Sequence, residues 1–127
     1  MNTTDIELTT QVEAIEAGYE FMLAYAAQGR DTDKELPGGS EIKNVLVSLS
    51  AALAVLRDNA GGRELPAHFQ SFLKTLAVDA ANASTAVELV VSQPRISSQL
   101  VDNLNASIHL RAVLTDLFLI DEALKCQ

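Results

Sequence analysis

Residues 66–91 read PAHFQSFLKTLAVDAANASTAVELVV, and the spacing of their apolar side chains decides the fold. Seven apolar residues recur at alternating steps of four and three: Phe69, Leu73, Leu76, Ala80, Ala83, Val87 and Val90. This spacing places all seven on one side of an α-helix, with Lys74, Asp79 and Asn82 directed elsewhere. An apolar stripe of this kind is stable in water only when other helices cover it. We therefore predict that residues 66–91 form a helix and that the rest of the chain supplies its neighbours.

Three further segments carry apolar residues at helical spacing. They are residues 5–28, 41–59 and 94–124, and glycine or proline residues lie at their boundaries. A chain of 127 residues is long enough to build one core without disulfides or structural metal. We predict a single all-α domain over residues 1–127, folded as an antiparallel four-helix bundle.

The middle of the 66–91 stripe consists of small residues, Ala80 and Ala83. Small side chains allow a neighbouring helix to approach closely, or they leave a small cavity. The sequence leaves open which of the two occurs, and whether a small ligand binds there.

The composition argues against several classes of partner. The formal net charge is −8 at pH 7, and the Lys and Arg residues are scattered singly, so no basic stripe is available for phosphate groups. The longest apolar stretch without a charge, residues 44–56, is shorter than the roughly 20 residues that cross a membrane. The first residues are polar and acidic, unlike a secretory signal, and Cys126 has no second cysteine to pair with. We expect a cytoplasmic protein that binds neither nucleic acid nor membrane.

No catalytic signature stands out from the sequence. Only His68 and His109 could act as acid–base groups near neutral pH. Glu13, Glu16 and Glu20 are interpreted as a solvated acidic face, because the Glu-x-x-His motif of di-metal bundles is missing. We therefore expect no enzyme activity, no cofactor and no metal.

His109 supports an alternative function. On a continuous helix, four polar residues fall in one sector: Asp102, Asn105, His109 and Asp116. This arrangement resembles histidine phosphotransfer domains, which are acidic four-helix bundles with an exposed phosphoacceptor histidine. Their motif places a basic residue at +3 and glycine at +4, whereas here Arg111 is at +2 and Ala112 and Val113 follow. The alternative prediction is a phosphotransfer-like signalling bundle with His109 as the phosphoacceptor.

Two motifs in the middle third of the chain are similar to those of flagellin-export chaperones, which are short acidic helical bundles. The first is the turn Gly61-Gly62-Arg63-Glu64-Leu65 followed by Phe69, Phe72, Leu73 and Leu76, and the second is Ile42-Lys43-Asn44 with Leu46. The family's tyrosines on the third helix are absent, and the long first loop and apolar C-terminal helix depart from its pattern. The resemblance implies a chaperone that wraps an apolar, partly unfolded helical segment of an export substrate.

The predicted last helix carries two apolar stripes instead of one. The stripe assigned to the core consists of Leu110, Val113, Leu114, Leu117, Ile120 and Leu124. The stripe on nearly the opposite side consists of Val101, Leu104, Ile108, Ala112, Leu119 and Ala123. Either this helix is central in the bundle, or the second stripe is an exposed patch of the kind that marks an interface.

We predict the second case. The chain would then be a non-enzymatic protein-binding module, acting as a chaperone, adaptor or regulator. Its second stripe would bind the helix of a protein partner, or a second copy of the chain in a two-fold homodimer.

Overall fold

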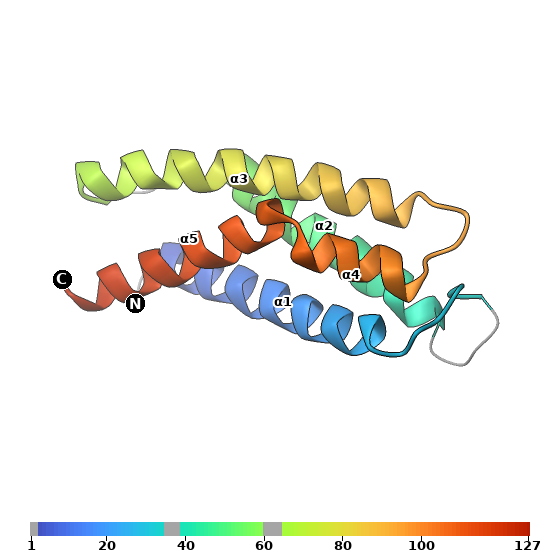
Figure 1. Cartoon of the computed structure of the whole chain (residues 1–127). Coiled ribbons are helices and arrows are strands. Elements are labelled where there is room, and N and C mark those ends of the chain that lie inside the picture. Colours follow the sequence, from blue (N-terminus) through green and yellow to red (C-terminus); the bar gives the residue numbers. More distant parts are fainter. Residues whose placement is uncertain (1–2, 35–38, 60–64) are drawn as a thin grey trace.

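The computed structural model describes residues 3–34, 39–59 and 65–127, and these residues form five α-helices and no strand (Figure 1). The helices are α1 (Thr3–Ala26), α2 (Gly39–Asn59), α3 (Ala67–Val91), α4 (Ser98–Ala106) and α5 (Ile108–Lys125). The predicted all-helical class is confirmed for these residues, whereas the predicted number of four helices differs from the five observed. No described helix is both long and apolar enough to span a membrane. Residues 60–64, which include most of the chaperone-like turn, lie outside the described part.

The helix α3 confirms the periodicity of residues 66–91. Six of the seven residues in the predicted stripe are buried: Leu73, Leu76, Ala80, Ala83, Val87 and Val90. Pro66 precedes the helix with a φ of −53°, and its missing N–H costs nothing at a helix start. Ala80 and Ala83 have no exposed surface, so the small middle of the stripe lies inside the core.

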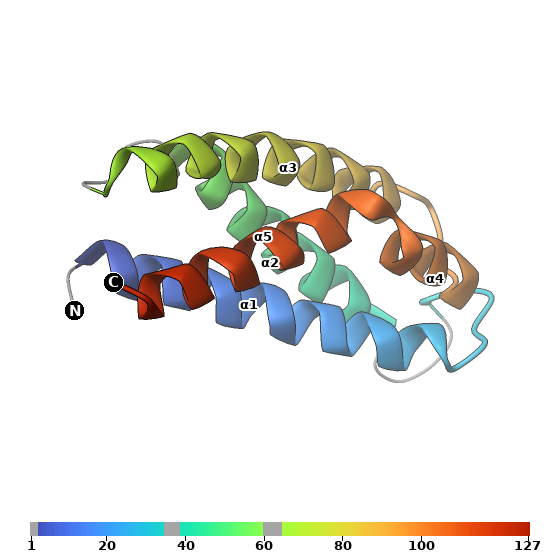
Figure 2. The same ribbon diagram turned by 60° about the vertical axis from the view of Figure 1, so that its left-hand side comes forward.

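The chain reverses direction after α1, after α2 and after α3, whereas α4 and α5 continue the same way (Figures 1 and 2). The helices α1 and α3 run in one direction, and α2 and then α4 and α5 run back. On one side of the molecule α2 packs against α1 and α3, and on the other side α5 lies against α3 and α1. Every helix contributes to the core, for example through Ile15, Leu46, Leu76, Val101 and Leu117.

The predicted helix over residues 94–124 is wrong in its extent, because two helices separated by Ser107 occupy this region. Ser107 has an extended backbone, with φ −65° and ψ 141°, and α4 begins only after Ser97. The Ser97 hydroxyl accepts a hydrogen bond from the Leu100 N–H at 3.0 Å, which caps the first turn of α4.

Burial of both helices explains the break at Ser107. Leu104 of α4 and Leu110 of α5 are both buried. On one straight helix these two side chains would point about 120° apart, because six residues at about 100° each turn the helix by about 600°. The extended residue between the helices allows both side chains to face the core.

A set of hydrogen bonds ties the start of α4 to the end of α1. The Tyr25 hydroxyl donates to the Ile96 carbonyl at 2.6 Å, and the Ser98 hydroxyl donates to the Tyr25 carbonyl at 2.7 Å. The N–H of Arg30 donates to the Ser98 hydroxyl at 2.8 Å, and the N–H of Ile96 donates to Asp33 Oδ1 at 2.9 Å. Burial, followed by the charge of Asp33, raises the pKa of the Tyr25 hydroxyl. These bonds hold α4 against α1 and thereby set the position from which α5 departs.

Candidate functional site

The helix α5 has a buried side and an exposed side. Five residues of the predicted core stripe are buried, namely Leu110, Val113, Leu114, Leu117 and Ile120, and Leu124 is partly buried against them. The opposite side consists of Ile108, Ala112, Thr115, Phe118 and Leu119, which we call the outer face of α5. Its three large apolar side chains are well exposed, with exposed fractions of 75% for Ile108, 54% for Phe118 and 55% for Leu119.

Local sequence explains why apolar side chains remain on this outer face. Residues 117–120 are apolar without interruption, and successive residues of a helix point about 100° apart. Burial of Leu117 and Ile120 therefore leaves Phe118 and Leu119 on the solvent side. The result is a large aromatic and a large aliphatic side chain next to each other at the surface.

The predicted interface stripe is divided by the fold. Val101 and Leu104 are buried within the chain, because the break at Ser107 turns α4 so that they face the core. They are therefore unavailable to a partner, and their assignment to an exposed stripe is corrected. Ile108 and Leu119 are exposed as predicted, and the small Ala112 and Ala123 are half-buried.

One apolar groove lies between the outer face and α3. It has a volume of about 150 Å³ and is lined by His68, Phe69, Phe72, Leu119, Ile120 and Ala123. Phe69 and Phe72 come from the first turns of α3, and the other apolar residues come from the second half of α5. This groove contains two members of the predicted interface stripe, Leu119 and Ala123.

A second groove lies on the other flank of α5, beside α1. It has a volume of about 290 Å³ and is lined by Glu16, Tyr19, Glu20, Leu114 and Phe118. Its α5 side is apolar, whereas its α1 side carries two carboxylates. Phe118 was not among the predicted interface residues, although the uninterrupted apolar run at residues 117–120 indicates an apolar side chain at the surface.

The polar sector predicted around His109 is not formed. His109 is exposed near the start of α5, and Asp102 is exposed on α4, but Asn105 and Asp116 are buried. The sector was derived for a continuous helix, and the break at Ser107 changes the relative orientation of its two halves. The side-chain oxygen and nitrogen of Asn105 are buried without a hydrogen-bond partner among the described residues.

Asp116 pairs with Asp79 of α3 instead of belonging to a site around His109. Burial is the largest cause that raises the pKa of Asp116, to about 7, and the hydrogen bond and charge of Asp79 add to it. Asp116 is 8% exposed, and Asp79 is half-buried. The negative charge of Asp79 disfavours a second negative charge at Asp116, so Asp116 keeps its proton to a higher pH. This pair lies between α3 and α5, to one side of the outer face.

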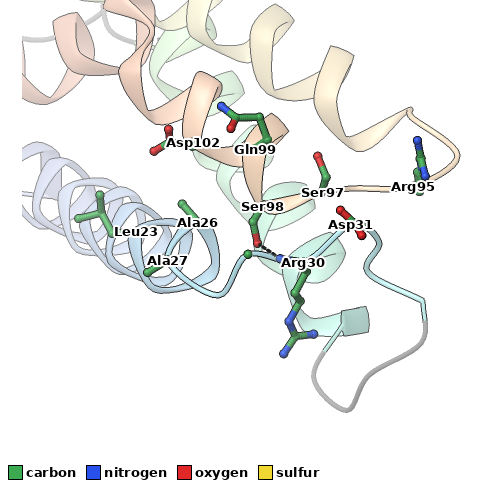
Figure 3. A pocket seen from close by; sticks show the side chains of 11 residues that line it. Leu23, Ala26, Ala27, Arg30, Asp31, Arg95, Ser97, Ser98, Gln99 and Asp102 are labelled. Atoms are coloured by element: carbon green, nitrogen blue, oxygen red, sulfur yellow. Dashed lines mark hydrogen bonds between the residues drawn. The ribbon is translucent and has the colours of Figure 1, made fainter.

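A polar pocket of about 630 Å³ lies at the opposite end of the molecule, beside the bonds that anchor α4 (Figure 3). Arg30, Asp31, Arg95, Ser97 and Asp102 are among the residues that line it. The side chains of Arg30 and Arg95 extend in opposite directions, so the two guanidinium groups do not converge on one ligand. The Arg30 guanidinium instead lies over the ring of Tyr25, at 5.3 Å from its centroid.

Within the described residues, no group of three or more His, Cys, Asp or Glu side chains is arranged to hold a metal ion. The strongest candidate site is therefore the outer face of α5 with its two flanking grooves. Comparisons with models of known protein families, with curated proteins and with solved structures found no match.

Proposed function

We propose that this chain is a cytoplasmic, non-enzymatic protein-binding module, which acts as a chaperone, adaptor or regulator through the outer face of α5. The observation that carries this proposal is the exposure of Ile108, Phe118 and Leu119 on one side of a single helix. Contiguous apolar surface on a folded protein is typical of sites that bind other proteins.

The two grooves beside α5 strengthen the proposal. Phe118 lines one groove and Leu119 lines the other, so both flanks of the outer face offer a recess for an apolar side chain. Complete burial of a fully exposed large apolar side chain contributes roughly 1.5–3 kcal/mol, and Phe118 and Leu119, which are about half exposed, would contribute about half of this. Burial of the three side chains would therefore favour binding. The measured free energy of binding is smaller than this sum, because association itself costs free energy.

We also infer that α4 and α5 together act as a broken fourth arm of an antiparallel bundle. The chain reverses direction after α1, α2 and α3, and α4 and α5 run back in succession, which supports this interpretation (Figure 1). In such a bundle α5 closes one side, and its outer face is directed away from the core. The helical partner segment implied by the resemblance to flagellin-export chaperones fits the same surface.

Photo-crosslinking in the native cell tests the protein-binding function. A photoreactive phenylalanine analogue at position 118 replaces an aromatic side chain, so the fold is preserved. The control carries the analogue at Val47, which is 55% exposed, like Phe118, but belongs to α2, a helix that does not pack against α5 in the described part of the chain. We expect a discrete crosslinked protein from position 118 and none from position 47. Equal crosslinking from both positions, or none from position 118, would contradict the proposal.

The exposure of His109 favours one alternative, a phosphotransfer-like signalling bundle. The alternative predicts an acid-labile phosphate on His109 after incubation with a small phosphodonor. His68 is also exposed and serves as the control. Labelling that disappears in His109→Ala and persists in His68→Ala would support the alternative, and absence of labelling in the unchanged chain would exclude it for that donor.

A further inference from the structure

The two grooves beside α5 differ in charge. The groove beside α3 is lined by apolar residues and His68, whereas the groove beside α1 has Glu16 and Glu20 along its rim. Glu13 precedes them on α1 by three and seven residues, so the three carboxylates follow one side of the helix. A row of negative charge therefore runs next to the exposed ring of Phe118.

Among the residues that the structure describes, these glutamates form no salt bridge. None of the three is within ion-pair distance of a Lys, Arg or His side chain in the described part of the chain. The salt bridges found there join Arg57 to Asp58, and Lys125 to Asp121 and Glu122. Like charges at this spacing on a helix repel each other. A bound cationic group would remove this repulsion.

We propose that the groove between α1 and α5 binds a basic amphipathic helix of a partner protein. An apolar side chain of that helix would enter the groove beside Phe118, and its Lys or Arg residues would face Glu13, Glu16 and Glu20. A helix lying along α1 meets this requirement when its basic residues recur at steps of three and four. This inference rests on the proposed protein-binding function and specifies the chemistry of the partner.

A second copy of the chain fits this groove less well. Each chain has a formal net charge of −8, so two copies repel each other at long range. In a homodimer, the glutamates of one copy would have to face basic residues on α5 of the other copy. Arg111 is available for this, whereas Lys125 already pairs with Asp121 and Glu122. Charge complementarity therefore selects a basic partner over self-association.

Two synthetic helices test the inference. The basic probe is an 18-residue peptide, the length of α5, with Leu at steps of three and four and Lys at the other positions. The acidic probe has Glu in place of every Lys. Binding is followed by nuclear magnetic resonance of the isotope-labelled full chain, which reports both the affinity and the backbone amides that shift. We expect the basic probe to shift the amides of Tyr19, Leu114 and Phe118, and the acidic probe to bind at least about tenfold more weakly.

Variants separate the charge from the apolar contact. Glu16→Gln/Glu20→Gln should weaken the basic probe about three- to tenfold, since each exposed charge pair contributes modestly. Glu41→Gln, which changes an exposed glutamate on α2, is the matched control and should leave the affinity unchanged. Phe118→Ser should weaken binding about tenfold or more, because it removes the apolar contact.

Three outcomes would overturn the inference, and they bear differently on the proposed function. If Phe118→Ser abolishes binding while Glu16→Gln/Glu20→Gln changes the affinity less than about twofold, the surface binds proteins without preferring basic ones. If the chain alone sediments as a dimer that Phe118→Ser dissociates, the occupant is a second copy. Both results leave the proposed function in place. If neither variant changes the affinity for the basic probe, the probe binds elsewhere on the chain. This result would contradict both the inference and the proposed binding surface.

Discussion

Asp79 of α3 lies close enough to Asp116 of α5 to influence its protonation, and after burial it is the next cause that raises the pKa of Asp116, to about 7. Burial and the neighbouring Asp79 both favour the protonated form of Asp116, so the contact between α3 and α5 depends on protonation. Burial is the main reason that Asp116 retains its proton close to neutral pH.

This relationship predicts that the chain loses stability as the pH rises towards neutrality. The pKa of Asp116 is about 7 in the folded chain, compared with an ordinary value of 3.8, so the folded state binds the proton more tightly than the unfolded state does. The stabilisation is complete below the ordinary pKa and is lost as the pH approaches the folded value. Between about pH 5 and about pH 8, the free energy of unfolding should fall by up to about 3 kcal/mol. Urea denaturation across this range measures it.

The variant Asp116→Asn assigns this pH dependence to the pair. An asparagine amide donates to Asp79 and carries no charge, so the slope of stability against pH should flatten, and the variant should be more stable than the unchanged chain at about pH 8. Asp102→Asn, at an exposed position on α4, serves as the control and should retain the slope. An unchanged slope in Asp116→Asn would show that other groups cause the pH dependence.

A second prediction concerns the small residues in the middle of α3. Ala83 is fully buried, so Ala83→Leu should overpack the core and lower the free energy of unfolding by roughly 1–3 kcal/mol. Ala51→Leu makes the same change at an exposed position of α2 and should have little effect. Thermal denaturation compares the two variants. A neutral or stabilised Ala83→Leu would reveal a cavity beside Ala83.

A third prediction concerns the interior of α4. Both polar atoms of the Asn105 side chain are buried without a partner among the described residues, and such a group costs about 1–3 kcal/mol to desolvate. Replacement by an apolar side chain of similar size should therefore stabilise the chain. We expect Asn105→Leu to raise the free energy of unfolding by about 1 kcal/mol in chemical denaturation. Asn103→Leu, at an exposed position, is the control, and a destabilised Asn105→Leu would indicate that Asn105 is hydrogen-bonded in solution.

Local periodicity predicted those parts of the fold in which one side of a helix is buried along its length. The stripe from Leu73 to Val90 and the core side of α5 are of this kind, because each step of three or four residues returns to the same neighbour. Periodicity failed at Ser107. There the burial of α4 against α1 and of α5 against α3 overrides the continuation of a single helix.

The contacts between distant residues could not be predicted from the sequence. The hydrogen bond between the Ser98 hydroxyl and the Tyr25 carbonyl joins residues 73 positions apart, and the pairing of Asp79 with Asp116 joins two helices. No local pattern encodes either contact. For the candidate site, the sequence indicated Ile108 and Leu119 correctly as surface residues, but it placed the buried Val101 and Leu104 beside them.

The central claim is that the outer face of α5 serves binding and contributes little to folding. The most direct test combines Phe118→Ser with Leu119→Ser in a chain that carries a photoreactive residue at the exposed position 115, between Ile108 and Leu119. We expect the double variant to unfold with a free energy within about 1 kcal/mol of the unchanged chain, as surface substitutions do, and to lose the crosslinked partner. The control Val47→Ser should retain the crosslink. A double variant that unfolds, or one that remains folded and still crosslinks the same partner, would contradict the claim.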